Sequence, residues 1–394
     1  MNDVFIHALG VTCALGDGAD AVRAALWRTD AAPGGEVTER YSAGRPLHLG
    51  TVDAALALPQ GTPLVHRTRN NALLHHAALQ CLPQLQAAIA RFGPARVAVV
   101  MGTSTSGIAE GGEAVDARSV GGAWPEGFHY GQQELGSPAQ FLAGALGVTG
   151  VAYTLSTACS SSAKALAAAA RLLRSGAADA VIAGGADTLC AFTVAGFSAL
   201  DSVSAARCNP LSVNRAGINL GEGAALFLLS REAGEVRLAG WGETSDAHHM
   251  SAPDPSGAGA QAAMRQALAR AGLAAGDIDY LNLHGTATPQ NDAMEALACA
   301  ALFGERVPLS STKPMTGHAL GAAGAIEAAL MWLTLAGNPR GRLPAHWWDG
   351  AADPALPPLR VVAPGEALGR APRYVMSNSF AFGGSNSAVI LGAG

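Results

Sequence analysis

The sequence predicts an α/β protein, because apolar runs typical of buried strands alternate with longer segments of helical spacing along the whole chain. This alternation restarts after a change of composition at residues 230–240, which predicts two halves, residues 1–234 and residues 235–394. Of the 394 residues, 49% are hydrophobic and only 14% are charged. Such a composition indicates a large interior, or a surface covered by a partner subunit.

The elements of the first half follow from periodicity, since short apolar runs indicate strands and apolar residues three or four positions apart indicate helices. Pro83 is expected to interrupt the longest helical segment, because proline cannot donate the backbone hydrogen bond of a helix interior. Gly176 is a helix-stop signal. These rules predict strands at 4–10, 96–102 and 179–187 and helices at 19–28, 71–93 and 161–176.

The second half repeats this order of strands and helices, which favours two related halves although no residue identity between them is detectable. The proline-rich segment 347–359 predicts a surface loop. The predicted elements are helices at 259–272, 292–304 and 323–337, a strand at 278–285, and a strand, turn and strand at 374–392.

Charge and composition argue against several classes of protein. The net charge is −5 and no run is rich in lysine or arginine, so we expect no nucleic-acid partner. No segment approaches the ~20 apolar residues that cross a bilayer, and the first residues, MNDVFIHALGVT, have an acid where a signal peptide has a base. We therefore expect a cytoplasmic protein without a membrane span. The six cysteines are irregularly spaced and form no C-x-x-C pair, which argues against disulfides and a metal site.

Cys159 lies where an apolar run turns into the helical segment 161–176, in STACSSSAKALAAAARLLRSG. The free N–H groups and partial positive charge of a helix N-terminus favour a thiolate. A strand-to-helix turn also lifts a nucleophile into a cleft. Cys159 is therefore a candidate nucleophile, and the alternative is a buried structural cysteine among small neighbours.

Three further stretches carry groups suited to electrostatic chemistry. His284 ends an apolar strand in LNLHGTATPQND, where ligands bind in α/β folds, and the alternative is a core histidine. Lys313, His318 and Glu327 fall within SSTKPMTGHALGAAGAIEAAL, and such groups are costly to bury unless they pair. Their alternative is a set of solvated loop charges, although the nearby glycines and alanines favour close packing. In NSFAFGGSN, the glycines after Phe382 permit a close backbone approach or an ordinary hairpin.

One cysteine and two histidines in separate glycine-rich loops fit nucleophilic acyl transfer, in which a thiolate takes an acyl group and imidazoles stabilise an oxyanion. These residues do not by themselves choose between a hydrolase, a transferase and a condensing enzyme. A serine hydrolase is disfavoured, because GTSTSG at 102–107 misses the G-x-S-x-G spacing of its nucleophile.

In this order, the four stretches resemble the β-ketoacyl-acyl carrier protein synthases of the elongating, Cys-His-His type, in the thiolase superfamily. The resemblance covers nearly the whole chain, and it implies a dimer with a thiolase-like, five-layered α-β-α-β-α fold from two related halves. It rests on the motifs TACSSSAKAL, HGTATPQND, TKPMTGHALGAAGAIE, NSFAFGGSN, GSPAQFLAGALGVTGVAYTLSTACSSS, NRAGINLGEGAALFLL and DAHHMSAPDPSGAG.

The resemblance implies a role for each matching residue. Cys159 would accept the growing acyl chain, and His284 and His318 would stabilise the enolate that malonyl-acyl carrier protein forms on losing carbon dioxide. Lys313 and Glu327 would organise the two histidines electrostatically. The enolate would attack the acyl thioester and give a β-keto product two carbons longer.

Further implied roles concern the substrate. The backbone N–H groups of Cys159 and Phe382 would form an oxyanion hole, and Phe382 would gate access to the thiol. Thr286 and Thr288 would bind the phosphopantetheine arm. This arm arrives on the carrier protein, so no cofactor and no metal are expected.

The acyl chain and the carrier protein would meet other residues. Thr105 and Ile108, in MGTSTSGIAEGG, would line the acyl pocket near the dimer interface and limit chain length. In RCNPLSVNR, Asn209 occupies the position of an arginine that faces the carrier protein in many members. The remaining candidates for binding this acidic partner are Arg67, Arg69 and Arg207.

Other departures from the family pattern are Asn291 and Ala381 at common glycine positions and Ser385 at a common threonine. They leave the catalytic set complete and favour a specialised clade, such as type II systems that make polyketides or aryl polyenes. Some of these systems include a catalytically silent partner subunit. The dimer partner is therefore either a second copy or a ketosynthase-like subunit.

Two related classes remain as alternatives for the chain itself. Non-catalytic chain-length subunits typically lack the nucleophile that is present here as Cys159. Degradative thiolases and initiating synthases typically use a second cysteine, or an asparagine in place of one histidine. The presence of both His284 and His318 argues against them.

Overall fold

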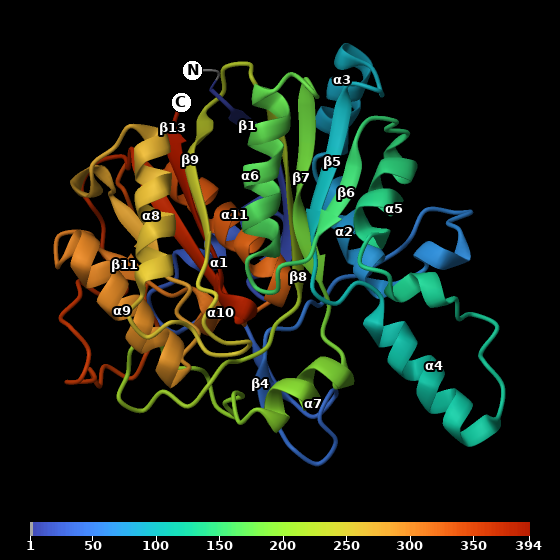
Figure 1. Ribbon diagram of the computed structural model, residues 1–394, viewed down its shortest axis with the longest axis horizontal. Coiled ribbons are helices and arrows are strands. Elements are labelled where there is room, and N and C mark those ends of the chain that lie inside the picture. The colour runs from blue at the N-terminus through green and yellow to red at the C-terminus, as the bar shows by residue number, and fades with distance from the viewer. Residues whose placement is uncertain (1–2) are drawn as a thin grey trace.

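The computed structural model describes residues 3–394 as a mixed α/β fold with helices on both sides of the strands (Figure 1). The elements of the first half are β1 (Phe5–Cys13), β2 (Gly16–Asp17), α1 (Ala19–Leu26), β3 (Glu36–Thr38), β4 (Leu47–Leu49), η1 (Leu64–His66), α2 (Arg69–Leu79), α3 (Leu82–Phe92), β5 (Val97–Gly102), α4 (Ile108–Gly121), η2 (Tyr130–Gln133), α5 (Ser137–Leu146), β6 (Ala152–Leu155), α6 (Ser161–Arg174), β7 (Ala180–Asp187), α7 (Ala191–Ala199) and β8 (Gly223–Ser230).

The second half continues directly from β8. Its elements are β9 (Val236–Ser245), α8 (Ala258–Ala271), η3 (Ala275–Asp277), β10 (Tyr280–Asn282), α9 (Pro289–Phe303), β11 (Leu309–Ser310), α10 (Lys313–Thr316), η4 (Leu320–Ala322), α11 (Ala323–Leu335), β12 (Tyr374–Ala381), η5 (Phe382–Gly384) and β13 (Ser385–Ala393).

The two halves have the same strand topology. The first half has the order β1-β8-β7-β5-β6 and the second has the order β9-β13-β12-β10-β11. In each, the first two pairings are antiparallel and the last two are parallel. A short pairing of β1 with β9, at Phe5–Arg237 and Ile6–Val236, joins the two sets of strands. The repeated order confirms two related halves, which residue identity did not reveal.

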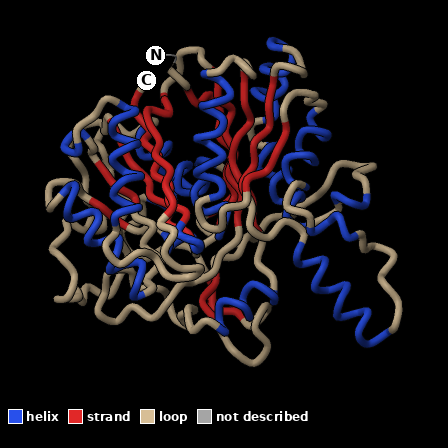
Figure 2. The backbone as a smooth tube through the Cα atoms, in the orientation of Figure 1, coloured by secondary structure: helices blue, strands red, loops and turns tan. Residues whose placement is uncertain are grey.

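Helices α6 and α11 lie between the two sets of strands, and further helices cover the outside (Figure 2). Successive residues of a strand face opposite sides, so Val100 of β5 packs toward the middle helices while Val99 packs toward the outer ones. Small residues make the middle layer thin. A Cβ on Gly324 of α11 would lie 2.8 Å from the Cβ of Ala163 in α6, so glycine is needed at this contact.

The outer layers complete the architecture. Helices α2, α3 and α5 cover the first set of strands, and α8 and α9 cover the second. The order from one side to the other is therefore helices, strands, helices, strands and helices. This is the five-layered, thiolase-like fold that the sequence motifs implied.

Most elements lie where periodicity predicted them. The helical segment around Pro83 is interrupted as expected, because α2 ends at Leu79 and α3 begins at Leu82. The segment 347–359 contains no helix or strand, also as expected. Periodicity missed β6, β8, β9, α4, α5 and α7, and of these α4 and α7 carry exposed apolar residues, such as Val115 and Phe192, and so lack one clear apolar face.

Two expectations about the whole chain remain predictions. The boundary between residues 234 and 235 falls in the connection between β8 and β9. Within residues 3–394, every helix is too short or too polar to cross a membrane. The cytoplasmic location stays a prediction.

Candidate active site

Cys159 lies in the turn that joins the end of β6 to the start of α6. Ala158, just before it, has a φ angle of 50°, a left-handed conformation that is costly for a residue with a side chain. Ser161 holds this turn, since its hydroxyl accepts from the N–H of Thr157 at 2.9 Å and donates to the carbonyl of Ala158 at 2.5 Å. The predicted strand-to-helix turn at the cysteine is confirmed.

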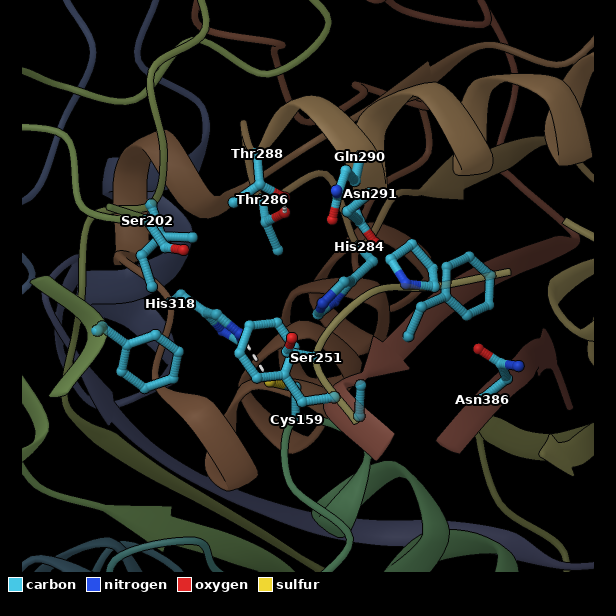
Figure 3. Close-up of a pocket in the computed structure, with 16 residues that line it drawn as sticks. Cys159, Ser202, Ser251, His284, Thr286, Thr288, Gln290, Asn291, His318 and Asn386 are labelled. Carbon is cyan, nitrogen blue, oxygen red and sulfur yellow. Dashed lines mark hydrogen bonds between the residues drawn. The ribbon is translucent and has the colours of Figure 1, made fainter. Parts of the chain in front are cut away.

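Two histidines reach the sulfur from separate loops of the second half. Nε2 of His318 lies 3.0 Å from Sγ of Cys159, and the rings of His284 and His318 are 5.2 Å apart, edge to face (Figure 3). His284 follows β10, where Glu295 of α9 accepts from the backbone N–H groups of His284 and Gly285 at 2.8 and 2.7 Å. This buried carboxylate therefore fixes the strand end that presents His284.

Lys313 and Glu327 form a buried ion pair beside the histidines, and each side chain is 2% exposed. Nζ of Lys313 donates to Oε1 of Glu327 and to the carbonyl of His284, both at 2.5 Å, and lies 3.3 Å from Nδ1 of His284. An ammonium has three donors, and these three contacts use all of them, which offsets the cost of burying the charge. The expectation of paired rather than solvated charges is confirmed.

Burial dominates the ionisation of this cluster. Burial raises the pKa of the Cys159 thiol to about 11, although the Lys313 charge and the backbone N–H groups of Phe382 and Cys159 lower it. Burial, followed by the Lys313 charge, holds the pKa of His284 and of His318 well below the ordinary value. At neutral pH both imidazoles are neutral and the sulfur is a thiol. Burial thus outweighs the thiolate-stabilising effect expected of the helix N-terminus.

A pocket of about 670 Å³ opens over the sulfur (Figure 3). Thr286 and Thr288, whose hydroxyl oxygens are 2.9 Å apart, line this pocket. Phe382 lines it too, packed against Phe197 with the ring centres 5.8 Å apart. The other lining residues are Phe197, Ser202, Ile218, Ser251, Pro253, Gln290, Asn291, Phe380, Ala381 and Asn386, together with the cysteine and the two histidines.

Thr105 and Ile108 do not line this pocket. Thr105 is buried, and its hydroxyl and backbone N–H donate to Asp187 at 2.7 and 2.8 Å. Ile108 begins α4 and lines a second pocket, of about 1610 Å³, whose wall includes residues of both α4 and α7. A role of these two residues in setting chain length stays a prediction.

The three candidate arginines differ in their surroundings. Arg67 is exposed, and its Nε donates to the carbonyl of Thr62 at 2.8 Å. Arg69 forms an ion pair with the fully buried Glu222 at 2.6 Å. Arg207 is half-buried and donates to three backbone carbonyls, those of Pro33, Gly34 and Pro314. The geometry therefore favours Arg67 for contact with an external acidic partner.

Asn209, at the position of the common arginine, is tied into the protein's own surface. Its side-chain oxygen accepts from the N–H of Asp349 at 3.1 Å. The Asp349 carboxylate accepts from Ser212 and Asn214 at 2.9 and 2.8 Å. This part of the surface is thus organised around an acid rather than a cation.

The sequence interpretation missed buried acids that support the site. Glu295 holds the His284 loop, and Asp187 accepts hydrogen bonds from the loop after β5 and from Ala322, close to α11. Glu295 lies in the apolar segment 292–304, and Asp187 ends the apolar segment 179–187. An acid inside a segment predicted to be buried indicates a structural or functional role, and this signal could have identified both residues.

One cluster within the described part of the chain has the donor types of a transition-metal site. The ligand atoms of Cys159, His284 and His318 all lie within 4.8 Å of one another. Thiolate and imidazole are ligands that zinc accepts. The absence of a metal from the working protein therefore stays a prediction.

Comparisons with known proteins agree with this geometry. The family model described as "Beta-ketoacyl synthase, N-terminal domain" matches residues 69–234, and "Beta-ketoacyl synthase, C-terminal domain" matches residues 236–339. The structure of the ketosynthase ApeO in complex with its chain length factor ApeC, from Xenorhabdus doucetiae, is 44% identical, with a TM-score of 0.92 over 100% of this chain and 98% of that chain. A β-ketoacyl synthase from Burkholderia phymatum STM815 is 28% identical, with a TM-score of 0.86 over 100% of both chains.

Curated relatives include the 3-oxoacyl-[acyl-carrier-protein] synthase 2 of Staphylococcus aureus and that of Rhizobium meliloti, each 36% identical. These matches cover 62% and 61% of this chain, and 64% and 60% of the relatives. The duplicated five-layered fold with its cysteine and two histidines defines a thiolase-like protein. More narrowly, the chain belongs to the β-ketoacyl synthase family.

Proposed function

We propose that this chain is a β-ketoacyl-acyl carrier protein synthase, which joins a Cys159-bound acyl group to the two-carbon unit of malonyl-acyl carrier protein. The observation that carries the proposal is the convergence of one thiol and two neutral imidazoles on a single pocket. Neutral imidazoles donate hydrogen bonds to a developing enolate without first giving up a proton. Decarboxylative condensation uses two such donors at the thioester oxygen, and the family to which the chain belongs supports this reaction over hydrolysis.

The first half-reaction transfers the acyl group to the enzyme. The sulfur of Cys159 attacks the thioester carbonyl of the acyl-carrier protein, and the thiol proton passes to Nε2 of His318, 3.0 Å away. From there it reaches the sulfur of the departing phosphopantetheine arm. The N–H groups of Cys159 and Phe382 would stabilise the oxyanion.

The second half-reaction forms the carbon–carbon bond. His284 accepts from Lys313 at Nδ1, so its proton is on Nε2, where it donates to the malonyl thioester oxygen. Nδ1 of His318 has no hydrogen-bond partner among residues 3–394, so His318 can change to the tautomer with its proton on Nε2 and donate to the same oxygen. Loss of carbon dioxide leaves an enolate, whose carbon attacks the thioester on Cys159. The enzyme sulfur leaves as a thiolate and takes up one proton from solvent water, which regenerates the thiol. The product is a β-keto thioester two carbons longer on the carrier protein.

The substrates arrive on carrier proteins. The hydroxyls of Thr286 and Thr288 would hydrogen-bond the phosphopantetheine arm, and the Phe382 ring would move to admit the acyl chain. Arg67 would contact the acidic carrier protein. The chemistry draws on the protein's own groups and on the arm of the carrier, so we propose that it needs neither a metal nor a resident cofactor.

A second proposal concerns the partner subunit. ApeO, a ketosynthase in complex with its chain length factor, matches this chain over its full length at 44% identity, whereas the curated synthases match at 36% over 62%. We propose that this chain pairs with a catalytically silent, ketosynthase-like subunit in a type II polyketide or aryl polyene system. The exposed apolar residues Val115 of α4 and Phe192 of α7 support an interface there. A homodimer in fatty acid synthesis is the alternative, and light scattering of the chain alone and with its candidate partner separates the two.

The proposed function is tested by intact-mass spectrometry. The protein is mixed with a panel of acyl-carrier proteins bearing saturated, polyunsaturated or aromatic chains, beside Cys159→Ala. A mass gain of one acyl group that is absent from the variant supports the proposal, and the best donor indicates the pathway. If no donor acylates the wild-type protein, alone or with its partner, the chain is a non-catalytic subunit instead.

A further inference from the structure

A chain of hydrogen bonds runs beneath the site described above. Nζ of Lys164 lies 2.6 Å from Oγ of Ser385, which lies 3.0 Å from Oγ of Ser160. The Ser160 hydroxyl donates to the carbonyl of Thr157 at 2.8 Å. Helix α6 supplies Lys164, and β13 begins with Ser385, so these hydrogen bonds join the two halves of the protein.

Lys164 fixes the direction of this chain. An ammonium can only donate, so the Ser385 oxygen accepts from Lys164. Because the Ser160 hydroxyl gives its proton to the Thr157 carbonyl, Ser385 donates to Ser160. Lys164 is half-buried, and this burial lowers its pKa. Its hydrogen-bond partner is a hydroxyl rather than a carboxylate. Partial burial of a cation whose contact is a hydroxyl carries a cost, which the nearby charge of Glu243 only partly offsets, and this argues against an incidental placement.

The same hydrogen bonds connect the two turns that carry the proposed oxyanion donors. Ser160 directly follows Cys159, and Ser385 comes three residues after Phe382. The two glycines that separate Phe382 from Ser385 have φ angles of 79° and 72°, so this turn has little side-chain packing of its own to hold it. Two backbone hydrogen bonds hold the turn, from the Gly383 N–H to the Met250 carbonyl at 2.8 Å and from the Asp246 N–H to the Gly384 carbonyl at 2.9 Å. The contact from Lys164 to Ser385 adds a side-chain tie to them.

We infer that Lys164 is a positioning residue for acyl transfer, which holds the N–H groups of Cys159 and Phe382 at the separation that an oxyanion requires. This inference rests on the proposed function. Lys164 itself does not line the pocket over the sulfur, so it acts through Ser385 and Ser160. Oxyanion donors work when they are fixed in place before the reaction, and small displacements reduce the rate.

The test compares four variants for the rate of Cys159 acylation by an acyl-carrier protein. Lys164→Met and Ser385→Ala remove the tie, whereas Ser385→Thr keeps the hydroxyl. Arg171→Met is the matched control, because it removes a half-exposed cation from the same helix. We expect Lys164→Met and Ser385→Ala to lower the maximal rate about tenfold with a half-saturating concentration within about twofold of wild type. Ser385→Thr and Arg171→Met should stay within about twofold of the wild-type rate.

Several results would overturn this assignment. One is acylation of folded Lys164→Met at the wild-type rate, and another is an equal loss in Ser385→Thr and Ser385→Ala. A raised half-saturating concentration with an unchanged maximal rate would instead place Lys164 in carrier docking. Thermal melts establish that each variant is folded. If Lys164→Met does not fold, the comparison of Ser385→Ala with Ser385→Thr still tests the inference.

A second measurement separates this inference from the proposed function. Alkylation of Cys159 by iodoacetamide needs no acyl donor, so it works even if no carrier protein acylates the enzyme. A loosened turn should admit the reagent several-fold faster in Lys164→Met and Ser385→Ala than in wild type or Ser385→Thr. Equal alkylation rates in all four proteins would overturn the inference about Lys164. Failure of the wild-type protein to be acylated, with different alkylation rates, would overturn only the proposed function.

Discussion

Nζ of Lys313 lies 3.3 Å from Nδ1 of His284, and this relationship sets the protonation of the site. Because an ammonium cannot accept, His284 must accept at Nδ1 and carry its proton on Nε2. The Lys313 charge also adds to burial in lowering the pKa of His284 and of His318. One lysine, balanced by Glu327, thus keeps two neutral imidazoles available as donors.

Replacing Lys313 by methionine should slow the decarboxylation of malonyl-carrier protein by about 10²-fold, because His284 loses the contact that fixes its proton. The change also leaves Glu327 as an unpaired buried acid, which is destabilising. Release of carbon dioxide measures the rate. The double variant Lys313→Met/Glu327→Gln should regain stability but not rate, and a double variant as fast as wild type would contradict the role of the lysine.

The reactivity of Cys159 should follow its raised pKa. Only the thiolate reacts with iodoacetamide, so the rate should climb about tenfold per pH unit from roughly pH 7 to pH 9 and should not level off in that range. Glutathione, whose thiol is exposed, is the control and levels off near its own pKa. A plateau for Cys159 below about pH 8 would show that the helix N-terminus outweighs burial after all.

Glu295 should make stability depend on pH, since burial raises the pKa of its carboxyl to about 7 from 4.5. The folded chain then binds more protons than the unfolded chain between these values. The contribution of Glu295 is therefore fully present below pH 4.5 and is lost as pH rises through about 7. It should change the unfolding free energy by at most about 1.4 kcal/mol per pH unit. Urea unfolding of wild type and Glu295→Gln measures the difference in slope, and equal slopes would refute the assignment.

Ile108 and Thr105 should respond differently to substitution. Ile108→Phe fills part of the second pocket, and the preferred acyl chain should become shorter if that pocket receives it. Thr105→Val removes a donor from the buried Asp187 and should cost about 1–3 kcal/mol of stability without changing the chain-length profile. Mass spectrometry of the acylated enzyme gives that profile. An unchanged profile in Ile108→Phe would count against a chain-length role for this residue.

Arg67→Glu should raise the KM for acyl-carrier protein about tenfold and leave kcat unchanged, because a rim charge mainly affects encounter with an acidic partner. The control is Arg306→Glu, at another exposed arginine in the second half of the chain. The difference in KM between Arg67→Glu and wild type should become smaller at high salt, because salt screens charge interactions. Equal KM values for the two variants would place the carrier protein elsewhere on the surface.

Much of the fold could be predicted because its strands and middle helices carry strong periodic patterns. The run 97–102 is apolar throughout because both faces of β5 are covered by helices. Helices α4 and α7 could not be predicted in this way, since their exposed apolar residues spoil the pattern of a helix with one buried face. The equivalence of the two halves became visible only as a repeated strand order.

The site was predictable where one local motif contains both the functional residue and the residues that flank it, as at Cys159, His284 and His318. It was not predictable where a role depends on a distant partner. Arg207 looked like a surface cation, but backbone carbonyls of residues 33, 34 and 314 surround its guanidinium. The tie between Lys164 and Ser385 joins residues 221 positions apart, and local sequence carries no sign of such a contact.

The central claim is tested most directly by a condensation assay with malonyl-carrier protein labelled with carbon-13 at the methylene carbon. Wild-type protein, with its partner if one is required, receives an acyl-carrier protein and then the labelled substrate. The account predicts a labelled β-ketoacyl-carrier protein two carbons longer than the donor chain, which Cys159→Ala does not form. Release of the acyl chain as a free acid, or loss of carbon dioxide without a new carbon–carbon bond in the wild type, would contradict it.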